Sequence, residues 1–171
     1  GPAHPPVIDR LADVMDCRSL AEIFDSADAI TRPTIAAAIL HSGRCPDLQT
    51  RILDTTSPNL DFETALVIEL ADRSSGDAML ALLARRPEVI GQVGIRVAAA
   101  VGLARSGRLD ETMELLMGEE GLESLPTAAR GHVRVSMLVA AMEADNRARA
   151  DLIATKLNRG DTRILARIVL D

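Results

Sequence analysis

Aromatic residues are nearly absent from this chain, which has no Trp, no Tyr and only two Phe, Phe24 and Phe62. Strands draw heavily on aromatic and β-branched side chains. Here Ala (26 residues) and Leu (22 residues) dominate instead, and both favour helices. The shortage also removes the flat faces on which proteins stack nucleic-acid bases or enclose organic cations. The composition therefore predicts an all-α protein without an aromatic ligand cage.

Lysine is almost missing as well. Of the 19 basic residues only Lys156 is not Arg, and the 25 acidic residues give the chain a net charge of −6. Nucleic acids and anionic membrane surfaces are bound largely through basic residues, so we expect neither as a partner. The preference for Arg is typical of a GC-rich genome, which indicates a bacterial source; selection for the forked hydrogen bonding of guanidinium groups is the alternative.

The chain has no long apolar run. Its longest, residues 97–104, is far shorter than the roughly 20 residues that cross a bilayer, so we expect no membrane insertion. Residues 1–4 are typical of a cleaved affinity tag, because Gly1-Pro2 is a common protease scar. Residues 5–171 are then one helical domain cut from a longer protein. Without the native N-terminus, the sequence leaves the compartment open between bacterial cytoplasm and periplasm.

Metal-binding residues are few. The chain has two cysteines, Cys17 and Cys45, and three histidines, His4, His41 and His132. Their spacing fits no metal site, so we expect no metal and no cofactor. Two buried free thiols are the favoured interpretation of the cysteines. A disulfide is the alternative, and it would imply an oxidising compartment.

Helical periodicity and helix breakers alternate from end to end. Apolar residues at positions 8, 11, 12 and 15 share one helix face, and Ser19 is placed to cap the next helix. Residues 92–105 are almost entirely apolar and should lie at the centre, whereas residues 118–125 should be irregular. The pattern predicts about eleven helices, the last capped by Asp161, joined by short turns that favour antiparallel pairs.

A turn motif recurs between the predicted helices. Ser42-Gly43-Arg44 and Ser106-Gly107-Arg108 each follow a helix and precede an Asp that opens the next one, and further turns fall near residues 76 and 145. The spacing of about 31–38 residues is that of repeats built from helix pairs. The sequence therefore predicts stacked antiparallel helix hairpins that form a short right-handed solenoid.

Residues 98–126 resemble a tetratricopeptide unit. The residues that carry the resemblance are Leu103, Gly107, Leu109-Asp110-Glu111, Leu115-Leu116 and Pro126. The aromatic positions of the motif are empty, and Thr112 stands where a small Ala is usual. The resemblance implies a solenoid of helix hairpins; HEAT-type repeats and a non-repetitive helical domain remain alternatives.

No set of residues forms a catalytic signature. Cys17 or Cys45 could be paired with His41 or His132, but no motif supports such a dyad. We therefore expect a protein that is not an enzyme. The alternatives are a superhelical accessory domain of a larger enzyme and a stand-alone enzyme with a pocket between helices, for which a cysteine of low pKa would be the sign.

Four residues are predicted to bind a partner. Gln92 and Arg96 lie one helical turn apart, Arg130 and Arg134 do the same, and the two pairs are 38 residues apart. Equivalent positions of a solenoid line up on one face, so the three arginines would form a stripe able to bind carboxylates. A solvated face with local ion pairs is the competing and commoner interpretation.

The predicted function is a non-catalytic protein–protein interaction module that acts as a scaffold, adaptor or assembly factor. Its expected partner is another protein, bound as a peptide or helix in a groove, and a homo-oligomer formed through a terminal hairpin is a further possibility. Four methionines either fill the core or supply an adaptable apolar patch: Met113, Met117, Met137 and Met142.

Overall fold

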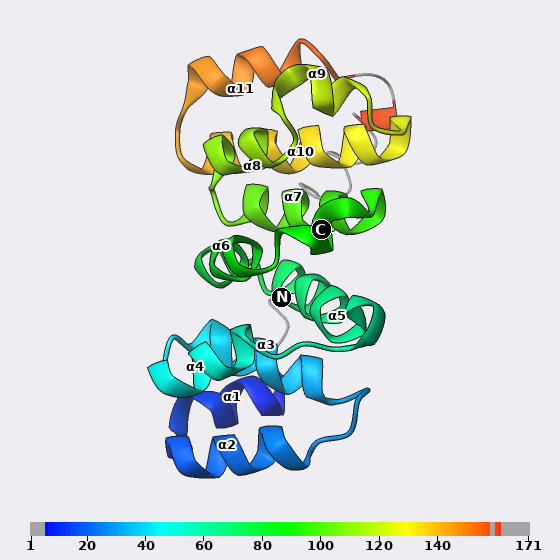
Figure 1. Ribbon diagram of the computed structural model, residues 1–171. Helices are drawn as coiled ribbons and strands as arrows, with labels where there is room; N and C mark the ends of the chain where they lie inside the picture. Colours follow the sequence, from blue (N-terminus) through cyan, green and yellow to red (C-terminus); the bar gives the residue numbers. More distant parts are fainter. Residues whose placement is uncertain (1–5, 158–159, 162–171) are drawn as a thin grey trace.

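The computed structural model describes residues 6–157 and 160–161, and every regular element in these ranges is helical (Figure 1). The helices are stacked in chain order, from α1 (Val7–Val14) and α2 (Cys17–Ser26) at one end to α10 (Thr127–Glu143) and α11 (Arg147–Ala154) at the other. The all-α prediction is confirmed. Between the ends lie α3 (Arg32–Ser42), α4 (Pro46–Leu53), α5 (Asp61–Asp72), α6 (Gly76–Arg85), α7 (Val93–Arg105), α8 (Leu109–Leu115) and α9 (Gly118–Glu123), with 3-10 turns at Pro58–Leu60 and Pro87–Gly91.

Five helices form one layer, in which α1 packs on α3, α3 on α5, α5 on α7 and α7 on α10. We call these the first helices, and α2, α4, α6, α8 and α11 the second helices. Small residues let the first helices approach closely. At Gly102 of α7, an added Cβ would lie 2.8 Å from the Cα of Ala71 in α5. As expected from its apolar sequence, α7 lies at the centre of the layer and is buried on both sides.

The first helices α3, α5, α7 and α10 end in the same way. Each is followed by a residue in the left-handed backbone region: Gly43 (φ 71°), Ser74 (φ 53°), Gly107 (φ 84°) and Asp145 (φ 55°). After the last three, a backbone N–H reaches back to the helix: Ser75 to Leu70 at 3.0 Å, Arg108 to Leu103 at 2.9 Å and Asn146 to Ala141 at 2.8 Å. This hydrogen-bonded ending satisfies carbonyl groups that the helix leaves free and reverses the chain. The turns fall at the predicted positions, except that the second centres on Ser74 rather than near residue 76.

Ion pairs join the segments of successive second helices. One Arg–Asp pair spans each junction: Arg51–Asp25 (2.6 Å), Arg85–Asp54, Arg108–Asp77 and Arg149–Asp110 (2.8 Å). These side chains are partly or largely exposed, so each pair stabilises the fold by less than about 1 kcal/mol. Their main effect is to favour one relative position of neighbouring second helices.

Two local predictions are wrong. Residues 118–123 form helix α9 instead of irregular chain, because Met117 (φ 63°) and Gly118 (φ 79°) turn the backbone and Leu122 is then buried. Ser19 does not cap α2; Asp16 does, by accepting a hydrogen bond from the Ser19 N–H at 2.8 Å. Of the helix predicted to follow Asp161, only residues 160–161 lie in the described part of the chain, and both are helical.

Cys17 and Cys45 form a disulfide, which corrects the favoured prediction of free thiols. Cys17 is the first residue of α2, and Cys45 precedes the first residue of α4. Both second helices pack against α3, which brings two residues 28 positions apart in sequence to a Cα–Cα distance of 5.6 Å. The pairing is therefore a product of tertiary packing that no local pattern encodes.

Candidate functional site

The four residues predicted to bind a partner lie at the start of α7 and in α10. Gln92 precedes α7 and is exposed. Arg96 donates through Nε to the carbonyl oxygen of Ile90 at 3.1 Å. Arg130 donates through Nη1 to the carbonyl oxygen of Glu123 at 3.2 Å. Arg134 is only 5% exposed. The three guanidinium groups therefore already have acceptors within the chain.

Arg96 and Arg134 belong to a larger set, which we call the anchor row. Its members, Arg32, Glu63, Arg96 and Arg134, each lie eleven residues before the left-handed residue that ends their helix. Each binds the segment leading into its own helix. Arg32 donates to the carbonyl oxygen of Ala27 at 2.9 Å, and Glu63 accepts from the hydroxyl of Ser57 at 2.7 Å. The spacing that suggested a binding stripe thus marks residues that fix the connections between helix pairs.

Arg134 is the member of the anchor row with bonds to two carboxylates of the same chain. Its Nη2 donates to Oε1 of Glu119 at 2.8 Å and also to Oε1 of Glu123. Both acceptors lie in α9, so this arginine ties α9 to α10. Burying a guanidinium group is costly unless carboxylates compensate its charge, and here two do. Whether Gln92, Arg96, Arg130 and Arg134 also bind a partner stays a prediction.

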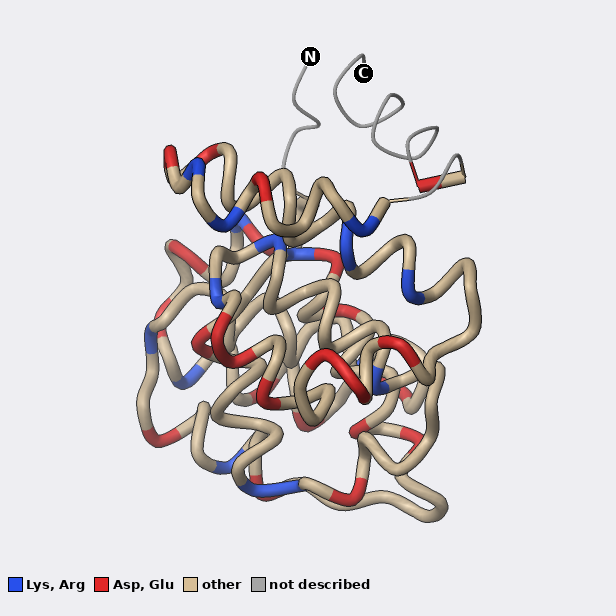
Figure 2. The backbone as a smooth tube through the Cα atoms, turned by 90° about the horizontal axis from the view of Figure 1, so that it is seen from above, with Lys and Arg blue, Asp and Glu red and all other residues tan. Residues whose placement is uncertain are grey.

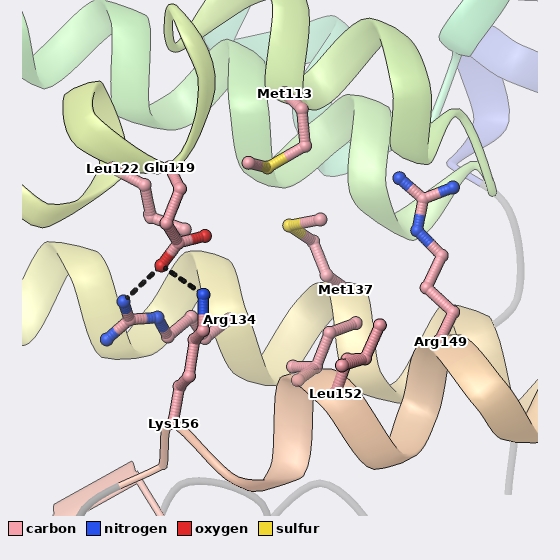
Figure 3. Close-up of a pocket in the computed structure, with 9 residues that line it drawn as sticks. Met113, Glu119, Leu122, Arg134, Met137, Arg149, Leu152 and Lys156 are labelled. Atoms are coloured by element: carbon pink, nitrogen blue, oxygen red, sulfur yellow. Dashed lines mark hydrogen bonds and ion pairs between the residues drawn. The ribbon is translucent and has the colours of Figure 1, made fainter.

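Next to Arg134 the structure has a pocket of about 220 Å³, the Met113 pocket (Figure 3). Met113 of α8 and Met137 of α10 face each other across it, and Leu152 of α11 lies beside them. The Glu119–Arg134–Lys156 cluster stands at one end and Arg149 at the other. The remaining lining residues are Leu122 and Ile153. The interior is thus aliphatic and thioether, with charges at its two ends.

The charged end is held together by a single carboxylate oxygen. Oε1 of Glu119 accepts from Nη2 of Arg134 at 2.8 Å and lies 3.1 Å from Nζ of Lys156. Burial by itself would raise the pKa of Glu119, but the hydrogen bonds and charges of Arg134 and Lys156 outweigh it and lower that pKa. Glu119 is therefore ionised at neutral pH, and the lining carries three cations against one carboxylate.

The dimensions of the Met113 pocket suit a protein side chain. Pockets for small molecules usually measure about 300–1,000 Å³, and this one is smaller. Methionine side chains are flexible and polarisable, so they adapt to apolar groups of different shape. Leu152 is 66% exposed, which leaves apolar surface available at the mouth of the pocket. The arrangement can receive an aliphatic side chain flanked by charged groups.

One hydroxyl–imidazole contact was not foreseen from the sequence. Nδ1 of His41 is hydrogen bonded to Oγ of Ser75, the residue before α6. A nucleophilic serine needs a base that a third group orients, and within residues 6–157 and 160–161 no carboxylate binds the other nitrogen of His41. The disulfide leaves no free thiol among these residues. They also hold no group of three or more side chains suited to a metal.

His132 of α10 is the other notable titratable residue. Burial, followed by the positive charge of Arg105 in α7, lowers its pKa below the ordinary value of about 6.5. The neutral imidazole therefore stabilises the fold above that pH, and the contribution is lost as the pH falls below it. Asp72 of α5 and Arg105 line the same hollow as His132.

We expect the melting temperature to decrease as the pH is lowered from 7.5 to 5.5. Protonation of His132 should account for about 1 °C of this decrease. His132→Gln removes that part, while His41→Gln, the matched change at an exposed histidine, keeps it. Differential scanning calorimetry across the pH range measures both. Equal slopes for the wild type and His132→Gln would contradict the assignment.

Charges of both signs are mixed over the molecule. In Figure 2, Lys and Arg positions lie among Asp and Glu positions and do not gather on a separate face. No helix in the described part of the chain is long and apolar enough to cross a membrane. Comparison of the chain with protein-family models, with curated proteins and with solved structures found no match in any of the three.

Proposed function

We propose that this protein is a non-catalytic protein–protein interaction module, a scaffold, adaptor or assembly factor, built as a short right-handed solenoid of helix hairpins. The solenoid is supported by the continuous packing of the first helices, the recurring left-handed turns and the anchor row. Solenoids present extended surfaces on which peptides and helices bind. The Cys17–Cys45 disulfide supports an oxidising compartment as its place of action.

The Met113 pocket is the observation that carries the proposal. It lies between the second helices α8 and α11, is lined mainly by aliphatic and thioether groups, and is open at Leu152. Side chains that fill well-packed pockets from which water is excluded typically supply much of the energy of a protein interface. We therefore place an aliphatic side chain of a partner peptide or helix between Met113 and Met137.

Leu152→Glu tests this role. Because Leu152 is largely exposed, the change leaves the fold intact but puts a charge at the mouth of the pocket. We expect the yield of the bound partner to fall at least about tenfold, as for loss of a central interface residue. The measurement is affinity co-purification of the tagged chain from its native cell, read by mass spectrometry, with circular dichroism to verify helicity.

Ile30→Glu is the matched control. Ile30 is 89% exposed and lies far along the chain from the pocket residues, so this variant should recover the partner as the wild type does. Recovery of untagged copies of the same chain would identify the partner as a second copy. The proposal is wrong if cross-linked wild type yields the bait alone, or if Leu152→Glu and Ile30→Glu retain the partner equally.

A further inference from the structure

The exposed side of the first helices carries a second surface, distinct from the Met113 pocket. A hollow of about 330 Å³ lies along α5 and α7 and reaches His132 of α10. An adjoining hollow of about 230 Å³ reaches from Ser74, after α5, to Glu143 of α10. Arg105 lines both. We call the two together the layer groove; it shares no lining residue with the Met113 pocket.

Charges of alternating sign cross this groove. Asp72, Arg105 and Glu143 are the last residues of α5, α7 and α10, and each stands two residues before the left-handed residue of its turn. The order across the layer is therefore acid, base, acid. All three are exposed, and none has a hydrogen bond or ion pair to another described residue. Most other arginines in the described chain are already bonded, so the unpaired state of Arg105 is unusual.

Aliphatic residues run beside the charges. Ile68 of α5, Val101 of α7 and Val139 of α10 each stand four residues before the charged residue of their helix, on the same helix face. Ile68 is 44% exposed, Val139 is half-buried and Val101 is only 6% exposed, so the strip is widest at Ile68 and Val139. Val97 extends the apolar lining on α7. A partner that crosses the layer therefore meets an apolar strip alongside an acid–base–acid strip.

We propose that the layer groove binds an amphipathic helix whose charged side chains run base, acid, base beside aliphatic residues. The acidic side chain binds Arg105, and the two basic side chains bind Asp72 and Glu143. The axes of packed helices lie about 8–10 Å apart. The charges on the neighbouring helices α5, α7 and α10 are therefore expected at about the same spacing.

The spacing favours a helix over an extended peptide. In a helix, residues seven positions apart share one face and are about 10.5 Å apart. The helical repeat lies about 0.5 Å outside the range of 8–10 Å, whereas an extended strand repeats each face at about 6.6 Å and again at about 13 Å, which lie about 1.4 Å and 3 Å outside it. The helix therefore presents its charges in register with α5, α7 and α10. This surface goes beyond the proposed function of the Met113 pocket. The two binding proposals are tested separately, so either can be refuted without the other.

The test uses designed alanine-rich helical peptides of about 22 residues, labelled for fluorescence anisotropy. One carries Lys, Glu and Lys at seven-residue intervals with Leu one turn before each, and its isomer carries Lys, Lys and Glu. The two have the same net charge, so general attraction to an acidic protein does not distinguish them. We expect wild-type protein to bind the Lys–Glu–Lys peptide at least about tenfold more tightly.

Two variants identify the surface. Arg105→Glu should abolish the preference between the peptides. Arg147→Glu makes the same charge change at an exposed arginine of α11 that has no partner among the described residues, and it should keep the preference. The triple variant Asp72→Lys, Arg105→Glu, Glu143→Lys should instead prefer a Glu–Lys–Glu peptide. Equal affinity for the two isomers, no binding of either, or equal effects of Arg105→Glu and Arg147→Glu would overturn the proposal.

Discussion

Replacing both Cys17 and Cys45 with Ser is expected to lower the free energy of unfolding by about 3.5 kcal/mol. The disulfide closes a loop between residues 28 positions apart, and a cross-link of that length removes roughly this much conformational freedom from the unfolded chain. Domains of this kind are stable by only about 5–15 kcal/mol, so the loss is a large share of the total. Urea denaturation followed by circular dichroism measures it.

Reduction gives an independent check of the same effect. Dithiothreitol should shift the urea midpoint of the wild type to that of the double Ser variant, and it should leave the variant unchanged. A thiol assay verifies that the bond has been reduced. If the fully reduced wild type keeps its original midpoint, the disulfide does not stabilise the fold.

Gly102→Ala is expected to destabilise the protein by about 2 kcal/mol. The new Cβ would lie 2.8 Å from the Cα and 3.0 Å from the Cβ of Ala71. The nearest obstacle is backbone, so α5 and α7 have to separate, and overpacking of this kind costs about 1–3 kcal/mol. Alanine recovers part of the cost because it favours helix more than glycine does. Thermal and urea unfolding give the difference.

Gly94→Ala is the matched control on the same helix. A Cβ at Gly94 meets no atom within 4 Å, so only the helix preference of alanine remains. This variant should be as stable as the wild type or gain up to about 1 kcal/mol. The two substitutions are chemically identical, yet only Gly102→Ala is predicted to lower the stability. Two destabilised variants, or two unaffected ones, would refute the argument from close helix approach.

The all-α class of the fold was predictable because its signals are local. The scarcity of aromatic residues is visible in the composition, and the helical periodicity and the turn residues at 43, 107 and 145 are visible in short stretches of sequence. Helix α9 was missed because its start depends on a left-handed Met117, which residue preference does not predict. The disulfide was missed because packing of α2 and α4 on α3, rather than a local pattern, joins its cysteines.

At the candidate site, the sequence predicted which positions are equivalent but not whether their side chains are exposed. The offset between Arg96 and Arg134 is real, and both occupy equivalent positions. No local pattern indicates that this position is turned toward the connecting segment, because its exposure depends on neighbours such as Glu119. Counting eleven residues back from every turn, which adds Arg32 and Glu63, would have revealed the anchor row. Extending it to the residues two positions before each turn would have revealed Asp72, Arg105 and Glu143.

The division of the core within α7 has a consequence for motion. Ala99 and Leu103 pack with the residues toward α1, whereas Ala100, Val101 and Ala104 pack with those of α8 to α11. The covalent link lies wholly in the first part. Local opening follows the least constrained unit of a structure, so we expect α10 and α11 to open more readily than α1 to α6. The Met113 pocket lies in the half without the disulfide, where we expect exchange between closed and open forms to require the least free energy.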